Sequence, residues 1–161
     1  FKDLPIEVFE SKYPVSIFNY GFRENSGGLG KFRGGVGLYR EYTINTDGFV
    51  SLWFERSVTP AWGLFGGKDG LPPNVNIKIP NEEEENLLKA NGLQIKNGTV
   101  LTTYTGGGGG FEEPLERDPE NVLDDVKNRY VTIEKAKEDY KVSITSDLKI
   151  DQNSTDKLRK N

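Results

Sequence analysis

The sequence predicts an α+β protein that is mostly β, with an antiparallel, sandwich-like sheet core and two short helices near the C-terminus. Two observations support this prediction. Several short segments before residue 105 alternate apolar and polar residues, which is typical of half-buried strands. After residue 117 the apolar spacing changes to three and four residues, which indicates helices. We expect the 161 residues to form one domain, β-rich over 1–105, followed over 106–161 by a glycine loop, helices and a terminal strand.

The first strands are predicted from alternation. Residues 1–12 fit an edge strand or a lead-in from a preceding domain, and residues 14–23 fit a strand with both faces at least half buried. Residues 36–45 and 49–56 predict a hairpin, because their apolar positions alternate on either side of Thr46-Asp47-Gly48. Glycine in the third position suits the left-handed conformation of a three-residue loop.

The middle of the chain predicts loops and shorter strands. Residues 57–73 indicate a long loop, and residues 74–79 a strand with Val75, Ile77 and Ile79 on one face. Residues 81–92 fit a short helix or a solvated loop, and four adjacent carboxylates favour an exposed segment because they repel each other. Residues 93–105 predict one or two strands with a turn at Asn97-Gly98.

The last third predicts helices. Asp118 is a good N-cap and Pro119 suits the first helical position, with Val122, Leu123 and Val126 on one stripe. Thr132 is positioned to cap a second helix that places Ile133, Ala136 and Tyr140 on one side. Residues 141–150 alternate like an edge strand. Residues 151–161 are polar, and we expect them to fray or to form one helical turn.

Composition excludes several classes of function. A net charge of −4 argues against a nucleic-acid binder, and no apolar run is long enough to span a membrane. The chain has no histidine and no cysteine, so it cannot itself build a histidine triad, a histidine zinc site or a thiolate nucleophile. Without a secretory signal, we expect a cytoplasmic protein. The chain starts at Phe1 and has no methionine, which fits either a trimmed tag or signal peptide or, as we expect, a fragment or domain of a longer protein.

Three glycine-rich segments, residues 26–37, 60–70 and 105–120, hold 15 of the 19 glycines. Glycine lets a backbone pass close to another backbone or to a ligand, and ordering so many glycines is entropically costly. The segments therefore predict a shaped surface that contacts another backbone or a ligand. Because Tyr104 and Phe111 flank the five-glycine run, a packed loop is favoured over a flexible linker.

Known glycine motifs fit poorly. In residues 28–34, Arg33 stands where the dinucleotide fingerprint needs glycine, and the segment precedes a predicted strand. Residues 63–68 resemble the end of a phosphate loop, but Asp69 occupies the next position, where a phosphate loop needs serine or threonine. Glu112, Glu113 and Glu116 are better explained as a solvated lead-in to a helix than as catalytic carboxylates. No nucleophile with an evident base stands out, so the catalytic residues are unknown.

The order of these segments resembles the hydantoinase B/oxoprolinase family. The resemblance rests on Tyr13-Pro14 and YGFRENSGGLGKFRGGVG (residues 20–37) with Arg40-Glu41-Tyr42, then on PAWGLFGGKDG (60–70), and on TGGGGG (105–110) followed by PLERDP (114–119) and YVTIEKA (130–136). It covers nearly the whole chain. Glu55-Arg56, where members often have Asp-Arg, Ser57-Val58-Thr59 and the acidic run at 82–85 depart from the family pattern.

The resemblance implies that the chain is the C-terminal portion of a B-type subunit. Members include hydantoinases and N-methylhydantoinases, 5-oxoprolinase, and acetone and acetophenone carboxylases. The B-type subunit acts with an A-type subunit that uses ATP, in hydrolysis of a cyclic amide or carboxylation of a ketone. The expected partners are thus the upstream part of the subunit and the A-type subunit. ATP with magnesium, and a further divalent metal in some members, would act in the full complex, with no cofactor or metal bound by this piece.

The piece itself is expected to be inactive alone and to supply an interface and part of a cavity wall. The candidates for the wall are Glu55, Arg56, Trp62, Gly66, Gly67 and Lys68, because charged and aromatic side chains lie there among glycines in loops. Arg33 and the loop that includes Gly106, Gly107 and Gly108 are candidates for interdomain contact. Two alternatives remain: an assembly domain without catalysis, and a carbohydrate- or ligand-binding β module that uses Trp53, Trp62 and Tyr104 as stacking platforms.

Overall fold

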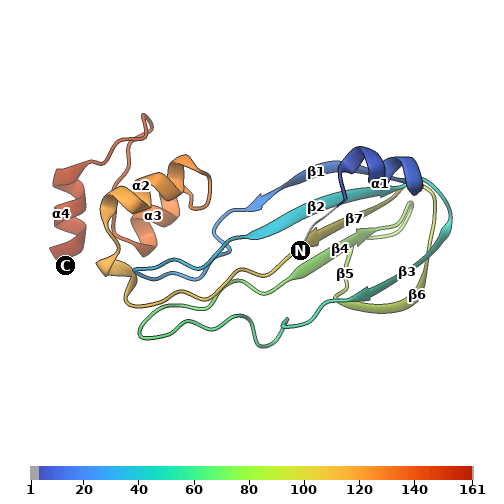
Figure 1. The fold of residues 1–161 in the computed structure, drawn as a ribbon, viewed down its shortest axis with the longest axis horizontal. Coiled ribbons are helices and arrows are strands. Elements are labelled where there is room, and N and C mark those ends of the chain that lie inside the picture. The colour runs from blue at the N-terminus through green and yellow to red at the C-terminus, as the bar shows by residue number, and fades with distance from the viewer. Residues whose placement is uncertain (1–3, 161) are drawn as a thin grey trace. The chain divides into compact units, whose positions relative to one another are not determined.

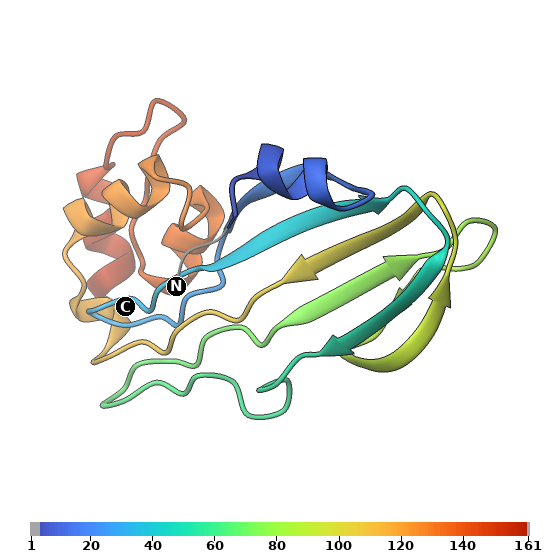
Figure 2. The same cartoon turned by 45° about the vertical axis from the view of Figure 1, so that its right-hand side comes forward.

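A computed structural model describes residues 4–160 and divides them into two compact units (Figures 1 and 2). The sandwich unit comprises residues 4–21, 38–57 and 73–105, and the glycine–helix unit comprises residues 22–37, 58–72 and 106–160. The glycine segments at 22–37 and 58–72 therefore group with the C-terminal helices rather than with the strands that flank them in sequence. The fold class predicted from the sequence is confirmed, while the assignment of the whole chain to one domain stays a prediction.

The sandwich unit is built from two antiparallel sheets. The larger sheet has the order β1-β2-β7-β4-β5, and the smaller pairs β3 with β6. The strands are β1 (Val15–Arg23), β2 (Gly37–Ile44), β3 (Gly48–Trp53), β4 (Asn74–Lys78), β5 (Glu85–Asn86), β6 (Lys89–Ile95) and β7 (Thr99–Tyr104). The core between the sheets draws buried residues from both, including Leu52 and Ile95 of the small sheet and Val75, Ile77 and Leu101 of the large one.

The predicted hairpin between residues 36–45 and 49–56 is wrong, although both strands exist. β2 pairs with β7, whereas β3 pairs with β6 in the other sheet. Asp47 accepts a hydrogen bond from the Asn97 amide at 2.7 Å, which joins the two short connections where the chain passes between the sheets. The apolar faces of β2 and β3 meet the same core from opposite sides, so alternation alone could not distinguish this arrangement from a hairpin.

Other strand predictions are confirmed. β4 buries Val75, Ile77 and the following Ile79, and the turn at Asn97-Gly98 separates β6 from β7. The acidic run at 82–84 is an exposed loop, as expected, but residues 85–86 and 89–92 belong to strands that the sequence analysis did not predict. β5 adds to β4 through the pairs Asn76–Asn86 and Ile77–Glu85.

The N-terminal prediction of an edge strand is wrong for the described residues, and residues 1–3 lie outside them. Residues Ile6–Lys12 form helix α1, which starts after Pro5. Phe9 packs against Tyr13 with ring centroids 5.0 Å apart, and against Tyr42 at 6.3 Å. The three-residue spacing of Ile6 and Phe9 fits a helix, although the surrounding residues also fit a strand. In the structure the segment is a helix, and Phe9 packs on Tyr42.

β1 is a strand as predicted, but its faces are not both half buried. Phe18, Tyr20 and Phe22 are exposed. β1 is an edge strand of a five-stranded sheet, and the facing sheet has only two strands. Phe22 belongs to the glycine–helix unit, where its ring packs edge to face on Tyr130 with centroids 5.3 Å apart.

The glycine–helix unit contains a 3₁₀ turn, η1 (Pro114–Glu116), and three helices, α2 (Pro119–Lys127), α3 (Ile133–Asp139) and α4 (Gln152–Lys160). The predicted caps are confirmed: the Asp118 carboxylate accepts from the Glu120 amide, and the Thr132 hydroxyl accepts from the Lys135 amide. The predicted stripe of Val122, Leu123 and Val126 is buried in a core shared with Ala136, Tyr140 and Val142.

Two C-terminal predictions are wrong. Residues 141–150 do not form an edge strand, because they fold back on themselves and leave only an isolated bridge between Ile144 and Ile150. Residues 152–160 form the full helix α4 instead of one turn. Thr155 anchors α4 in the unit: it is buried, and its hydroxyl accepts a hydrogen bond from the Ser143 amide at 3.0 Å.

Candidate functional site

The three glycine segments lie side by side in the glycine–helix unit and bond to one another through their backbones (Figures 1 and 2). The Gly28 amide donates to Gly108 and the Gly108 amide donates to Gly35, both at 2.8 Å. The Gly110 amide donates to Lys68 at 2.9 Å, and the Lys68 amide donates to Leu29 at 2.7 Å. We call this bundle of residues 26–37, 60–70 and 106–112 the glycine framework.

The framework requires glycine because its backbones touch. A Cβ atom added at Gly107 would lie 1.8 Å from the Ser26 carbonyl oxygen, and one added at Gly109 would lie 2.0 Å from that of Trp62. Real Cβ atoms do not approach a carbonyl oxygen so closely. The five-glycine run is thus a packed loop rather than a flexible linker, which confirms the prediction made from its aromatic flanks.

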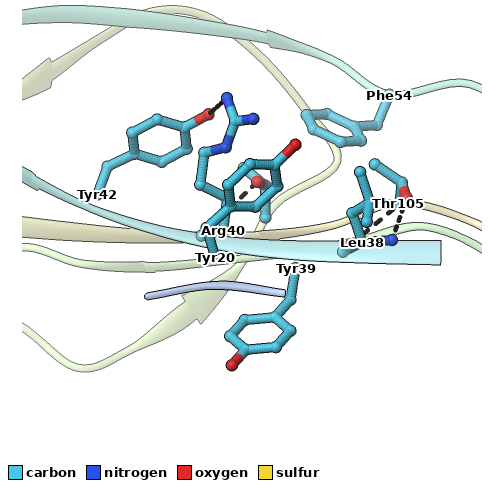
Figure 3. Close-up of a pocket in the computed structure, with 8 residues that line it drawn as sticks. Tyr20, Leu38, Tyr39, Arg40, Tyr42, Phe54 and Thr105 are labelled. Carbon is cyan, nitrogen blue, oxygen red and sulfur yellow. Dashed lines mark hydrogen bonds between the residues drawn. The ribbon is translucent and has the colours of Figure 1, made fainter. Parts of the chain in front are cut away.

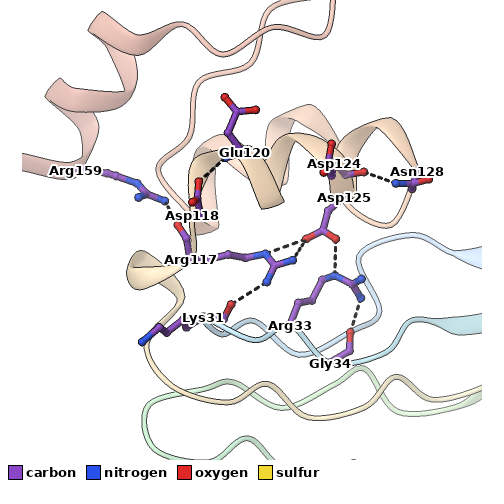
Figure 4. A network of polar contacts seen from close by, with 10 residues as sticks. All are labelled: Lys31, Arg33, Gly34, Arg117, Asp118, Glu120, Asp124, Asp125, Asn128 and Arg159. Atoms are coloured by element: carbon purple, nitrogen blue, oxygen red, sulfur yellow. Dashed lines mark hydrogen bonds and ion pairs between the residues drawn. The ribbon is translucent and has the colours of Figure 1, made fainter.

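Arg33, a candidate for interdomain contact, extends from the framework into a buried ionic cluster of the same unit (Figure 4). Its Nε lies 3.2 Å from Asp125 Oδ1, and both side chains are nearly buried. Its guanidinium also donates to the Gly34 carbonyl and lies 5.0 Å from the centre of the Tyr130 ring. The structure therefore gives Arg33 contacts within the unit, and its role between domains stays a prediction.

Asp125 of α2 receives a second guanidinium from Arg117. The Arg117 Nε and Nη2 atoms lie 3.0 and 2.9 Å from Asp125 Oδ2, and Nη1 donates to the Lys31 carbonyl at 2.8 Å. Arg159 of α4 donates in turn to the Arg117 carbonyl at 2.7 Å (Figure 4). This cluster ties the framework to α2 and α4. The cluster could not be predicted from the sequence, because its members are far apart in the chain.

Tyr140 lies fully buried near this cluster. Burial raises the pKa of its phenol to about 12, while the positive charge of Arg117 acts in the opposite direction. The phenol therefore stays protonated at neutral pH. This group belongs to the packing of the unit rather than to proton transfer.

A pocket of about 340 Å³ opens beside the framework in the same unit. Its apolar lining comes from Leu29, Leu71 and Val131, and its polar lining comes from Asn25, Lys68, Asp69, Lys135 and Asp139. Lys68, predicted for the cavity wall, thus does line a cavity. Among residues 4–160 its ammonium group has no ion-pair or hydrogen-bond partner.

The other charged groups of this pocket are already engaged. Asp69 accepts a hydrogen bond from the Gly63 amide at 2.9 Å. Lys135 lies 3.0 Å from Glu138 and 3.9 Å from Asp139, and both carboxylates hold the pKa of Lys135 above its usual value. Partial burial raises the pKa of Asp139, and Lys135 opposes this rise. Lys68 is therefore the lining group that is best placed to receive an anion. The spacing of Lys135 and Asp139 on one helix face could have indicated their pairing from the sequence.

The remaining wall candidates fall in both units. Trp62 is exposed on the framework, and Gly66 and Gly67 form a turn of it. Glu55 and Arg56 follow β3 in the sandwich unit, where Glu55 forms an exposed ion pair with Lys89 at 3.1 Å. Arg56 adopts a φ of 62°, which is uncommon for a residue other than glycine.

A second pocket, of about 470 Å³, lies in the sandwich unit (Figure 3). Its lining includes Tyr20, Leu38, Arg40, Tyr42 and Phe54. The Arg40 guanidinium lies 4.1 Å from the centre of the Tyr20 ring, and its Nη1 donates to the Tyr42 hydroxyl at 3.2 Å. This aromatic pocket was not predicted, because β1 was expected to be covered.

The stacking platforms of the alternative carbohydrate-binding hypothesis are dispersed. Trp53 lies on β3 and Tyr104 on β7, in different sheets, and Tyr104 packs instead against Tyr39 with ring centroids 6.4 Å apart. Trp62 belongs to the other unit.

Residues 4–160 include no group of three or more histidine, cysteine, aspartate or glutamate side chains that could hold a metal ion. No helix in this described part of the chain is long and apolar enough to cross a membrane.

Comparison with known proteins places these features in a family. Residues 1–114 match the sequence profile of hydantoinase B/oxoprolinase. The chain is 37% identical over 158 residues to an uncharacterised protein of Methanocaldococcus jannaschii, covering 96% of this chain and 28% of that protein. It is 36% identical over 159 residues to a protein of a Pseudomonas strain that is named as the B-type subunit of a D-/L-hydantoinase, covering 97% and 27%.

A solved structure shares the fold. The ATP-dependent caprolactamase of Pseudomonas jessenii superposes with a TM-score of 0.77 at 29% identity, over 98% of this chain and 28% of that chain. The chain thus spans little more than a quarter of the length of these curated relatives.

Proposed function

Because this chain belongs to the hydantoinase B/oxoprolinase family, we propose that it is a segment of a B-type subunit that acts with an ATP-using A-type subunit in the hydrolysis of a cyclic amide. The observation that carries the proposal is the identity to the D-/L-hydantoinase relative, which extends over 97% of this chain and includes all three glycine segments. Cyclic amides of the hydantoin and 5-oxoproline type are the proposed substrates, and carboxylation of a ketone is the alternative reaction. The proposed site of action is cytoplasmic.

Within that subunit, we assign this segment a supporting role rather than the bond-breaking step. Residues 4–160 offer no metal-binding cluster and no histidine, and their strongest ionic cluster, around Asp125, is internal to one unit. ATP, magnesium and any further metal of the full complex would then act through residues outside this segment.

Lys68 is our main candidate for a contribution to the cavity wall. Its ammonium group, which is unpaired among residues 4–160, belongs to a pocket that is partly lined by apolar residues, and its backbone is fixed on both sides by the framework. Ring opening of a cyclic amide creates a carboxylate, and a fixed ammonium group stabilises such a developing anion. Arg56 is the corresponding candidate in the sandwich unit.

The test uses the full-length subunit with its A-type partner. Lys68→Ala and Arg56→Ala are each expected to lower kcat/KM for amide-dependent ATP hydrolysis at least about tenfold, which corresponds to about 1.4 kcal/mol of transition-state stabilisation. Lys137→Ala removes an exposed lysine of α3 that does not line the pocket, and is expected to stay within about twofold of wild type. Hydantoin, 5-oxoproline and caprolactam serve as substrates, with a ketone and bicarbonate as the carboxylation arm.

Normal turnover and normal association in both Lys68→Ala and Arg56→Ala would show that these residues are not part of the wall. If alanine variants in the loops of the glycine framework instead lose association with the A-type partner, while each assembled complex turns over normally, the segment is an assembly domain.

A further inference from the structure

The glycine framework exposes several large apolar side chains. Where its glycines touch neighbouring backbones, an added Cβ would clash, so no side chain fits at these contacts. Four apolar residues, Phe32, Leu64, Phe65 and Phe111, are between 38% and 76% exposed. We call these four residues the aromatic crest.

The crest is one continuous patch. The Phe111 ring contacts Phe65 edge to face with centroids 5.2 Å apart, and lies 6.2 Å from the Phe32 ring. The Phe111 backbone bridges to Phe32 on one side and to Leu64 on the other. Each glycine segment therefore contributes to the patch, and the hydrogen bonds of the framework fix its shape.

Phe65 is presented by a strained backbone. Its φ is 53°, in the left-handed region where a bulky aromatic residue is a genuine outlier, and Gly66 follows with a φ of 99°. Such conformations cost on the order of 1–3 kcal/mol and concentrate at functional sites. Within residues 4–160 the strain is not compensated by burial, because Phe65 is the most exposed member of the crest.

The charges beside the crest are mainly negative. Lys31, whose ammonium lies 5.9 Å from the centre of the Phe32 ring, pairs with Glu112 at 3.0 Å and Glu116 at 3.3 Å. These two carboxylates hold the pKa of Lys31 above its usual value, so it stays charged. Glu113, beside Gly66, adds a third carboxylate. One ammonium group against three carboxylates leaves an excess of negative charge along this rim.

We propose that the aromatic crest is the surface on which the partner subunit of the proposed complex docks, through an apolar segment flanked by lysine or arginine. This inference rests on the proposed function, which supplies the partner. A rigid aromatic patch has the composition of an interface hot spot, and the acidic rim selects a basic counterpart and accelerates encounter.

The test measures the dissociation constant between the full-length subunit and its A-type partner. Phe65→Asn removes the ring and relieves the strain, because asparagine tolerates the left-handed conformation. The dissociation constant is expected to rise at least about tenfold while the unfolding temperature of the subunit stays the same or increases. Phe49→Asn is the matched control, since Phe49 on β3 is 74% exposed, against 76% for Phe65, and lies in the sandwich unit. It is expected to change the dissociation constant less than about twofold.

A second variant tests the rim. Glu113→Lys is expected to slow association several-fold, with the difference from wild type shrinking as salt concentration increases.

Three results would overturn the proposal. One is equal affinity of the Phe65→Asn and Phe49→Asn subunits. Another is a lower unfolding temperature in Phe65→Asn with unchanged affinity, which would place the crest against another part of its own subunit. A dimer of the subunit that Phe65→Asn dissociates, with partner affinity unchanged, would assign the crest to a second copy.

Failure of the proposed function looks different. If the two subunits associate through Phe65 but hydrolyse no ATP with any cyclic amide, the docking surface holds and the catalytic proposal fails. If the wild-type subunits do not associate, the partner itself is refuted and the docking proposal falls with it.

Discussion

At the scale of single residues, the buried carboxylate of Asp125 connects the parts of the glycine–helix unit. It lies between the guanidinium groups of Arg33 and Arg117, and the Arg117 carbonyl accepts from Arg159. Two cations around one anion compensate its desolvation, and removing the anion would leave both cations buried without it. From the sequence, Arg33 was predicted to contact another domain. An arginine among glycines has no evident ion-pair partner nearby in the sequence, and its partner Asp125 comes much later in the chain.

Asp125→Asn is expected to destabilise the chain by about 3–5 kcal/mol, because two nearly buried guanidinium groups lose their counter-charge. Urea unfolding at neutral pH measures this change. Glu138→Gln, which removes an exposed partner of Lys135, serves as the control and is expected to cost less than about 1 kcal/mol. Similar losses in the two variants would mean that the cluster is not a structural anchor.

Tyr140 predicts a dependence of stability on alkaline pH. The pKa of its phenol is about 12 in the folded chain against 10.0 as the ordinary value, so between these pH values the unfolded state loses a proton that the folded state keeps. The stabilisation is complete below pH 10 and is lost as pH rises toward 12, by about 2–3 kcal/mol at most.

Tyr140→Phe removes this ionisation. Wild type is therefore expected to lose about 2–3 kcal/mol more than Tyr140→Phe between pH 9 and pH 12, as measured by urea unfolding at each pH. Parallel pH profiles of the two proteins would contradict the burial of the phenol.

At the scale of elements, local signals were sufficient where the determining contact is close in sequence. Asp118 and Thr132 were predictable as caps because each side chain bonds an amide two or three residues ahead. The predicted β2–β3 hairpin was wrong because the partner strand is chosen by contacts across the core, which alternation does not encode. α4 was missed because its residues are polar, and its position depends on contacts with distant residues through the Thr155 hydroxyl and the Arg159 guanidinium.

For the glycine framework, close packing could be predicted from the sequence, but the position of its segments relative to one another could not. The aromatic flanks of the five-glycine run correctly indicated packing, but nothing in the composition showed that the partner of each glycine segment is another glycine segment. Lys68 could be selected as a site candidate from its loop. Its neighbours in the pocket, Lys135 and Asp139, could not be linked to it, since they belong to a helix in the last third of the chain.

Gly107→Ala tests the framework directly. The new Cβ would meet the Ser26 carbonyl oxygen at 1.8 Å, so two backbones must separate, and we expect a loss of at least about 3 kcal/mol or failure to fold. Gly35→Ala is the matched control, because a Cβ at Gly35 meets no atom within 4 Å. Its effect is expected to stay below about 1 kcal/mol. Thermal unfolding of both variants decides, and equal stability would exclude close backbone packing at Gly107.

At the scale of the whole molecule, the two units differ in how they are built. The sandwich unit has a conventional apolar core, whereas the glycine–helix unit combines a helical core with a framework that displays charged and aromatic side chains. The candidates Trp62, Gly66, Gly67, Lys68 and Gly107 all lie on this framework, and Glu55 and Arg56 lie in the sandwich unit. The chain spans little more than a quarter of the length of its curated relatives.

The measurement that tests the central claim most directly is complementation. This chain, co-expressed with the rest of its subunit and the A-type partner, should co-elute with both and increase amide-dependent ATP hydrolysis over the same mixture without it. If the chain neither co-elutes with them nor increases turnover, the result contradicts the assignment of this segment to a B-type subunit of an ATP-dependent cyclic-amide hydrolase.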